Sequence, residues 1–338
     1  GGMAQGLFAT LIIGTIIQQI GLFMGGGTGD LIYELGKIAA GLTGAGIGVG
    51  VARKLEAGHL VIVSAAVVGM IGAFAGKILS GQVLVDGNLV LAGPGEPLGA
   101  FAAAYLAIEI GILISGKTKL DIILTPLVCI GTGSAVGLFV GPPISEFMLW
   151  LGSLINWGTE QQPFLMGIVV SVLMGMILTL PISSAALGVI LNLSGLAAGA
   201  ATIGCCCNMI GFAVASWREN KFSGFLAQGI GTSMLQIPNI VRRPLIWLPV
   251  ILSSAVLGPI GTMLLHMTNN ATGSGMGTAG LVGPLMTWQV MTQSEAGVIV
   301  LGKIILIQFI LPAAVTLLIS EFMRKKKWIR QGDMKLEL

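Results

Sequence analysis

The sequence has little charge. Lys, Arg, Asp and Glu together make up 9% of its 338 residues, whereas a soluble globular domain carries about 25%. So few charges cannot cover a water-facing surface of this size, which excludes an ordinary soluble protein. Hydrophobic residues make up 54% and the mean hydropathy is +0.95. We therefore expect the chain to be solvated mostly by the lipid of a bacterial-type inner membrane.

Cysteine and histidine are also scarce, with four and two residues. Cys205, Cys206 and Cys207 are adjacent within an apolar run, and Cys129 is alone. Adjacent positions on a helix point in different directions, so these residues suit neither a compact metal cage nor a disulfide framework. Phosphate-binding loops, dinucleotide fingerprints and hydrolase triads are also missing. The sequence therefore predicts no metal, no cofactor and no catalytic residue.

Glycine, by contrast, is abundant, with 52 residues. Small residues let helices approach closely within a membrane. So much glycine also predicts broken helices and re-entrant hairpins. Irregular backbone at membrane depth is tolerated only where protein buries it or where it lines a wet cavity. Glycine content therefore favours a transporter or channel over a simple anchor.

Apolar runs long enough to cross a bilayer recur along the whole chain. Counting runs of about 20 residues predicts an all-α, polytopic transmembrane helical bundle of about 9–10 spans with re-entrant hairpins. One run, from Leu120, is expected to end at Gly141-Pro142-Pro143, before an interfacial helix that reaches Asn156. We expect a single membrane domain over residues 1–323.

The densest basic cluster follows the last apolar run. It extends from Arg324 through Lys325-Lys326-Lys327 to Arg330. The positive-inside rule places such a cluster in the cytoplasm. We therefore predict a multi-pass protein with a basic cytoplasmic tail, residues 324–338, which anchors the topology and does not bind nucleic acid.

Ionisable residues inside apolar segments are functional candidates, because burying them in lipid is costly. Glu96 lies in the break Gly93-Pro94-Gly95-Glu96-Pro97 and is the first candidate for binding a polar solute. The alternative is an ordinary external loop. His266 and Glu160 are candidates for ion coupling, with a structural histidine and a solvated turn as their respective alternatives.

Uncharged polar residues form a second group of candidates. Thr232, Ser233, Gln236 and Asn239 occur in one apolar stretch, and Asn192 and Asn208 belong to another. Such hydroxyls and amides either join helices to one another or line a hydrophilic path for a solute. The sequence does not separate these two roles.

Several stretches resemble blocks of the membrane subunit IIC (EIIC) of the bacterial phosphotransferase system, in its fructose–mannitol-like branch. One pair of blocks is Val140-Gly141-Pro142-Pro143-Ile144 and Pro163-Phe164-Leu165-Met166-Gly167. Pro181 and Ala185-Ala186 lie where the family has Asp-x-Gly-Gly-Pro-x-Asn-x-Ala-Ala. The stretch from Gly231-Thr232 to Pro238 is similar to its Gly-Ile-Thr-Glu segment. The whole chain resembles a standalone EIIC-like group without fused A or B domains.

The chain departs from these motifs at their polar positions. The family's aspartate position holds Ile177, its Gly-Gly holds Thr179-Leu180 and its asparagine holds Ser183. The glutamate of Gly-Ile-Thr-Glu falls at Ser233 or Met234. The catalytic-type carboxylate therefore does not carry over to any residue of this chain.

The resemblance implies a homodimer in membrane lipid that moves a sugar or polyol by alternating access. A separate cytoplasmic EIIB-type protein would phosphorylate the solute if the system is complete. Ser233, Gln236 and Asn239 would occupy a re-entrant tip that grips the solute. One alternative is a membrane sensor or regulator that binds a small or lipid-like ligand without phosphotransfer. Another is an ion-coupled transporter that uses Glu96 or His266.

Overall fold

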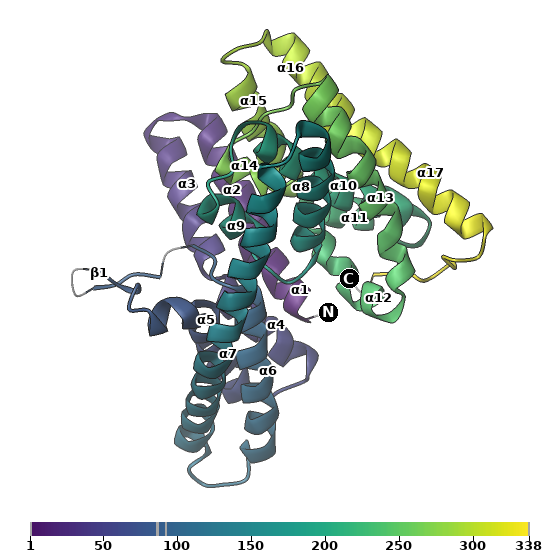
Figure 1. The fold of residues 1–338 in the computed structure, drawn as a ribbon. Helices are drawn as coiled ribbons and strands as arrows, with labels where there is room; N and C mark the ends of the chain where they lie inside the picture. The colour runs from purple at the N-terminus through teal and green to yellow at the C-terminus, as the bar shows by residue number, and fades with distance from the viewer. Residues whose placement is uncertain (1, 86–87, 92, 337–338) are drawn as a thin grey trace. The chain divides into compact units, whose positions relative to one another are not determined.

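The computed structural model describes residues 2–85, 88–91 and 93–336, and this part of the chain is helical almost throughout (Figure 1). The predicted all-α polytopic helical bundle is confirmed. The chain divides into two compact units, Gly1–Leu149 and Trp150–Leu338. These are unit 1 and unit 2, respectively.

Unit 1 consists of helices and one small hairpin. Its elements are α1 (Gly2–Leu7), the π-helical turn η1 (Phe8–Ile12), α2 (Ile13–Met24), α3 (Gly26–Gly41), α4 (Thr43–Lys54), α5 (His59–Leu79), the antiparallel strands β1 (Leu84–Val85) and β2 (Asn88–Leu89), α6 (Pro97–Ile114) and most of α7 (Asp121–Thr159).

Glycines bring the backbones of α5 and α6 into contact. A Cβ on Gly72 of α5 would lie 2.5 Å from the carbonyl oxygen of Gly99 on α6, and the reverse distance is also 2.5 Å. Only residues without a side chain allow the two backbones to come this close. Close packing of this kind holds helices together in lipid, where no hydrophobic force drives them to associate. The abundance of glycine thus reflects packing in this unit.

Unit 2 contains many short and interrupted helices. After the end of α7 come α8 (Pro163–Thr179), α9 (Ser184–Ile190), α10 (Gly195–Ala215), α11 (Trp217–Leu226), η2 (Ala227–Gly231), η3 (Ser233–Gln236), α12 (Ile237–Arg242), η4 (Pro244–Trp247), α13 (Leu248–Pro259), η5 (Ile260–Leu264), α14 (Ala271–Ser274), η6 (Ala279–Leu281), α15 (Val282–Met291), α16 (Gly297–Ile304), η7 (Ile305–Ile310) and α17 (Leu311–Lys325).

Seven helices of the described residues are long and apolar enough to span a membrane, or eight if a bent pair in unit 1 counts as one span. The bent pair is α3 and α4, which meet at 49°. The seven are Gln5–Met24, His59–Leu79, Pro97–Ile114, Asp121–Ile144, Gly195–Ala215, Pro244–Leu264 and Gly297–Lys325.

Among the described residues, fewer helices are long and apolar enough to span a membrane than the apolar runs alone predict, for two reasons. The run near residues 222–239 and the glycine-rich run near 268–287 fold into short pieces. The helix expected to end at Gly141-Pro142-Pro143 instead continues, so residues 144–156 prolong α7 and do not form a separate helix. Membrane helices tolerate internal proline where neighbouring groups satisfy the freed backbone carbonyls.

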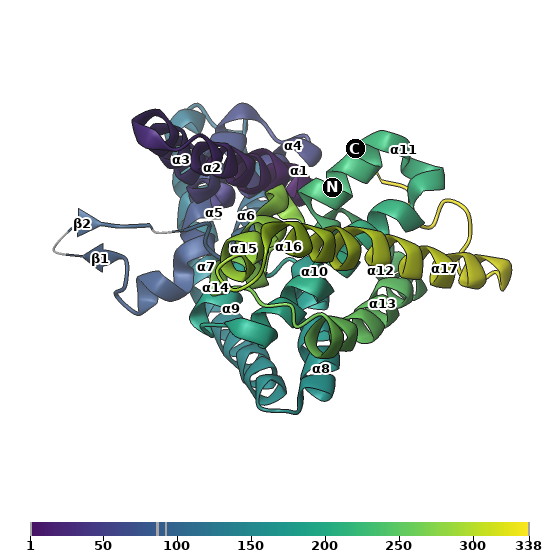
Figure 2. The same cartoon turned by 90° about the horizontal axis from the view of Figure 1, so that it is seen from above.

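Helix α10 is the centre of unit 2. Every residue from Ala198 to Ala213 is buried, as expected of a helix that is apolar on all sides. It packs against α8, α13 and α17, and Figure 2 shows it lying among them. The Ser171 hydroxyl of α8 donates to the Ser254 carbonyl of α13 at 2.8 Å, which joins these two neighbours of α10.

We expect Gly204→Ala on α10 to lower the free energy of unfolding by about 1–3 kcal/mol, because overpacking forces the backbones apart. A Cβ at this position would overlap the Ser171 carbonyl group of α8. Thermal unfolding in detergent measures the effect. Gly131→Ala is the control, because no atom lies within 4 Å of a Cβ there. Equal unfolding temperatures for the two variants would show that α8 and α10 do not pack as described.

Candidate functional site

Two helix breaks meet beside α10. Pro181 disfavours helical backbone at Leu180, whose ψ is 158°, so α8 ends at Thr179. The second break is Thr232, which is extended between η2 and η3 with φ −158° and ψ 139°. The hydroxyl oxygens of Thr179 and Ser233 are 2.9 Å apart, across 54 residues of sequence. Both side chains are completely buried, so the two breaks form one polar cluster.

Asn208 of α10 holds this cluster together. Its Oδ1 accepts hydrogen bonds from the Thr179 hydroxyl at 3.1 Å and from Trp247 Nε1 at 3.2 Å. Its Nδ2 donates to the Gly204 carbonyl at 3.1 Å and to the Ser254 hydroxyl at 3.4 Å. Asn208 is fully buried, and an amide side chain can make about four such bonds. We call Thr179, Asn208, Ser233, Trp247 and Ser254 the break cluster.

A third break adds a second polar group around Asn269. Its Nδ2 lies 2.8 Å from the Thr202 hydroxyl, 3.0 Å from the Thr287 hydroxyl and 3.2 Å from the Gly283 carbonyl. Gln308 Nε2 donates to Thr287 at 2.8 Å. The other amide atom, Gln308 Oε1, is buried without a hydrogen-bond partner in the described part of the chain. Unit 2 therefore has an unused acceptor in its interior.

The chemistry of the break cluster is neutral. It offers hydroxyls and amides without any carboxylate, and no group of three or more His, Cys, Asp or Glu side chains in the described residues could hold a metal ion. Such groups can exchange their mutual hydrogen bonds for bonds to the hydroxyls of a neutral solute. The arrangement therefore suits the binding of a neutral, hydroxyl-bearing solute.

The predicted residues of the Gly231 stretch take part in two different arrangements. Ser233 belongs to the break cluster, and the Thr232 hydroxyl accepts from the Met234 N–H at 3.2 Å and so caps η3. Gln236 and Asn239 are buried and hydrogen-bonded to each other, with Asn239 Nδ2 donating to Gln236 Oε1 at 2.8 Å. These two amides face the C-terminal segment of the chain.

Residues 326–336, which we call the C-terminal strap, fold back onto unit 2. Gln236 Nε2 donates to the Met334 carbonyl at 3.1 Å, and Asn239 Nδ2 donates to the Lys335 carbonyl at 2.9 Å. Asn220 makes two hydrogen bonds with the strap, both at 2.8 Å. Its Nδ2 donates to the Met334 carbonyl, and its Oδ1 accepts from the Leu336 N–H. Residues 337–338 of the predicted tail lie outside the described residues. The strap thus occupies amides that sequence reasoning assigned to a solute.

The strap also contributes to the core of unit 2. Ile329 and Met334 are buried in one cluster with Phe212, Ile240 and Val250. Full burial of a side chain of this size stabilises by about 1.5–3 kcal/mol. This segment is therefore a packed part of the unit.

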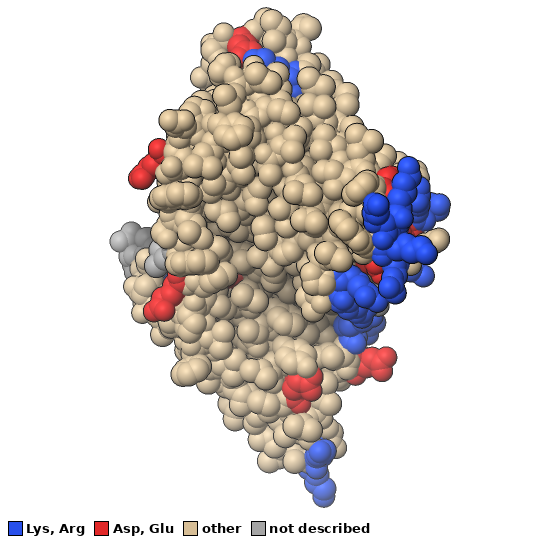
Figure 3. Space-filling view, turned by 45° about the vertical axis from the view of Figure 1, so that its right-hand side comes forward, with Lys and Arg blue, Asp and Glu red and all other residues tan. Residues whose placement is uncertain are grey.

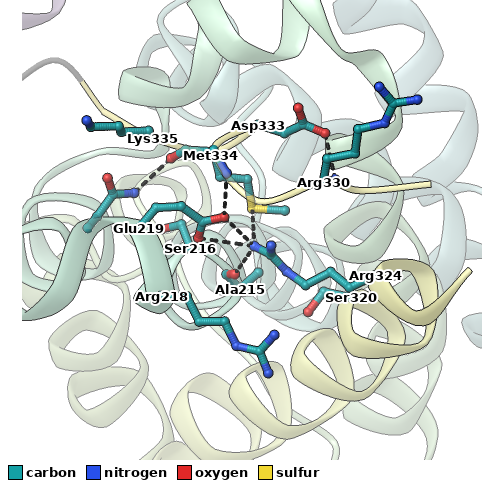
Figure 4. Close-up of polar contacts among 12 residues, drawn as sticks. Ala215, Ser216, Arg218, Glu219, Ser320, Arg324, Arg330, Asp333, Met334 and Lys335 are labelled. Atoms are coloured by element: carbon teal, nitrogen blue, oxygen red, sulfur yellow. Dashed lines mark hydrogen bonds and ion pairs between the residues drawn. The ribbon is translucent and has the colours of Figure 1, made fainter. Parts of the chain in front are cut away.

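A buried ion pair lies beneath the strap (Figure 4). Arg324 of α17 and Glu219 of α11 are 2.9 Å apart, with side chains 8% and 3% exposed. Arg324 also donates to the Ala215 carbonyl at 2.9 Å, and Glu219 accepts from the Gly332 N–H at 3.3 Å. The pair therefore links α10, α11, α17 and the strap.

The remaining predicted residues lie apart from the break cluster within unit 2 or belong to unit 1. Asn192 is exposed in the turn after α9 with φ +47°, and Glu160 is exposed after α7. His266 is exposed, with φ +48°, and lines a cavity of about 280 Å³ whose walls are mostly apolar. Glu96 belongs to unit 1, where it precedes α6 and its N–H donates to the Ala73 carbonyl at 2.8 Å.

Sequence reasoning did not single out Thr179 as a site residue, and it named Asn208 only as one of the polar residues of an apolar segment. The available signal was polarity, because each is a hydrogen-bonding residue in an otherwise apolar helix. Thr179 also stands at a motif position of the family that the chain resembles. Neither signal says which segments meet, and the distance between Thr179 and Ser233 is a property of the fold.

Apolar spans and a neutral polar cluster at helix breaks define a multi-pass membrane protein of the solute-transporting class. The family model described as Phosphotransferase system, EIIC matches residues 1–336. The chain therefore belongs to the EIIC family, the membrane sugar-transporting components of that system. Members work in membrane lipid with a separate EIIB protein and a sugar substrate. Among curated proteins, none matches the chain.

Proposed function

We propose that this EIIC protein moves a neutral sugar or polyol across the membrane by alternating access. We assign it to the fructose–mannitol-like branch and to the standalone group without fused A or B domains. A separate EIIB-type protein would phosphorylate the solute on arrival. The motif stretches quoted above, from Val140 to Pro238, support the branch.

The observation that carries the proposal is the hydrogen bond between Thr179 and Ser233. Each residue lies at a helix break, and each break is a stretch that resembles a motif of the family. Broken helices present free backbone groups and side-chain hydroxyls at membrane depth, where transporters bind their solutes. The two hydroxyls bond to each other, and they can exchange this bond for hydrogen bonds to the hydroxyls of a solute.

Our proposed substrate residues follow from this arrangement. Thr232 and Ser233 are retained from the sequence prediction, and Thr179 and Asn208 are added. Gln236 and Asn239 would act on the solute only after releasing the strap. Asn192 and Glu96 remain proposals, with Glu96 the single carboxylate among the substrate residues. For ion coupling we prefer His266 over Glu160, because His266 lines a cavity.

Figure 3 shows a patch of Lys and Arg side chains, and the exposed basic residues of unit 2 include those of α11, α12 and the strap. The positive-inside rule supports a cytoplasmic face here and a cytoplasmic C-terminus. We further propose a homodimer, with residues 1–323 as membrane domain and 324–338 as basic tail.

We expect at least one member of a panel of radiolabelled hexoses, pentoses and polyols to bind the purified protein in lipid nanodiscs. Ser233→Ala should then weaken binding about three- to tenfold, because one buried hydrogen bond contributes about 0.5–1.5 kcal/mol. Ser294→Ala, an exposed serine in a turn of unit 2, is the control. Binding that is unchanged by Ser233→Ala would remove the break cluster from the site.

One observation favours a second function, a sensor without phosphotransfer. The family's glutamate falls at Ser233 or Met234, and the break cluster contains no carboxylate. A sensor would bind the same solute without net uptake. Binding in nanodiscs together with absent uptake by vesicles would support this second function.

A further inference from the structure

A basic pocket lies where the C-terminal strap leaves α17. Its volume is about 390 Å³, and its lining residues are Arg218, Arg324, Lys327, Ile329, Arg330 and Gln331. Four of these six side chains are cationic. No residue of the break cluster lines it, so it is a separate feature of unit 2.

The pocket contains more cationic side chains than acidic side chains that pair with them. Arg218 is 2.9 Å from Glu321, and Arg324 is 2.9 Å from Glu219. Lys327 and Arg330 have no ion pair with any described residue, and both side chains are exposed. Asp333 accepts from the backbone N–H of Arg330 at 2.8 Å and is paired with Arg243 outside the pocket, at 3.8 Å. The pocket therefore keeps two unneutralised cations.

Arg324 supplies a further observation. Its side chain is 92% buried, and Nη2 donates to the Ala215 carbonyl and to Glu219. Its Nε is buried without a hydrogen-bond partner among the described residues. Burying a guanidinium donor without an acceptor is unfavourable. Arg324 also lines the pocket, and phosphate oxygens match the donor geometry of arginine.

Tryptophans indicate the depth of the pocket in the membrane. Trp217 precedes Arg218, and Trp328 lies between Lys327 and Ile329. Their exposed fractions are 45% and 53%. Exposed tryptophan beside basic residues is typical of the headgroup level of a bilayer. Basic pockets at that level bind anionic headgroups.

We propose that this pocket binds a phosphate group and that the bound phosphate fixes the strap to α11 and α17. Arg330, Lys327 and Arg218 surround the phosphate, and Arg324 lies in the pocket wall beside them. The phosphate belongs either to an anionic lipid or to a soluble phosphate ester. This site is independent of the proposed sugar transport.

The test compares two double variants of the full-length protein. Lys327→Gln with Arg330→Gln removes two pocket cations. Lys325→Gln with Lys326→Gln removes the same charge from exposed neighbours that do not line the pocket. Native mass spectrometry measures retention of phosphatidylglycerol against phosphatidylcholine. Calorimetry with inorganic phosphate and glycerol phosphate in a neutral detergent measures the soluble source.

We expect the pocket variant to bind phosphate ligands about tenfold or more weakly than the wild type, because it lacks two cations that attract the phosphate group. The control variant should stay within about twofold. Preference for phosphatidylglycerol assigns the site to lipid, and binding of the soluble phosphates alone assigns it to a soluble ester. Equal losses of phosphate binding in both variants would overturn the proposal, because they would show that diffuse surface charge and not the pocket attracts the phosphate. Absence of binding to any phosphate in the wild type would overturn it as well.

Discussion

Asn208→Ala is expected to reduce the initial rate of sugar uptake by folded protein at least tenfold. Asn208 bonds Thr179, Trp247 and Ser254 at once, so its removal leaves several buried groups without a partner. Each buried polar group without a partner costs about 1–3 kcal/mol. A loss of about 1.4 kcal/mol corresponds to an approximately tenfold change in an equilibrium constant or a rate. Uptake of labelled sugar by vesicles, normalised to folded protein in the membrane, measures the effect.

Two further variants distinguish a site effect from misfolding. Trp247→Phe removes one donor to Asn208 and keeps an aromatic ring, so we expect a smaller loss of uptake than for Asn208→Ala. Asn156→Ala changes an exposed amide of α7 and should leave uptake unchanged. Wild-type uptake by Asn208→Ala would show that the break cluster plays no part in transport.

Glu219→Ala is expected to lower the free energy of unfolding by about 3–5 kcal/mol, because it leaves a buried arginine without its counter-charge. Glu219 is 3% exposed, and its partner Arg324 is 8% exposed. The strap also loses the acceptor of the Gly332 N–H. Thermal unfolding in detergent, with limited proteolysis of the C-terminus, reports both consequences.

Glu321→Ala is the matched control for this change. Glu321 pairs with Arg218 at the same 2.9 Å, but the two side chains are 31% and 61% exposed. Solvent-exposed pairs contribute about 0–1 kcal/mol, so the control should differ little from the wild type. Similar unfolding temperatures for Glu219→Ala and Glu321→Ala would contradict the burial described for Arg324.

Composition and apolar runs were sufficient to predict the class of fold. Charge of 9% and runs such as His59–Leu79 require helices in lipid, because a bilayer leaves the backbone few other ways to satisfy its hydrogen bonds. The number of spans was less predictable. Whether residues 222–239 form one span or several short pieces depends on contacts with α10 and the strap, which the local sequence does not contain.

The site was predictable only in part. Ser233 was identified from polarity within an apolar stretch and from the family resemblance. Its partner Thr179 comes from a helix 54 residues earlier, and periodicity carries no information about such a pairing. Gln236 and Asn239 were also predicted to bind the solute, but in the structure they bond to the strap. Their amides suited a sugar equally well, and only the fold reveals that the carbonyls of Met334 and Lys335 occupy them.

Labelled sugar uptake into vesicles, with and without added phosphotransfer proteins, tests the transporter assignment most directly. We expect uptake that depends on the EIIC chain, rises when the phosphotransfer proteins are present, and delivers the solute as its phosphate ester. Vesicles with correctly inserted protein that bind the solute but accumulate none of it under either condition would contradict the assignment.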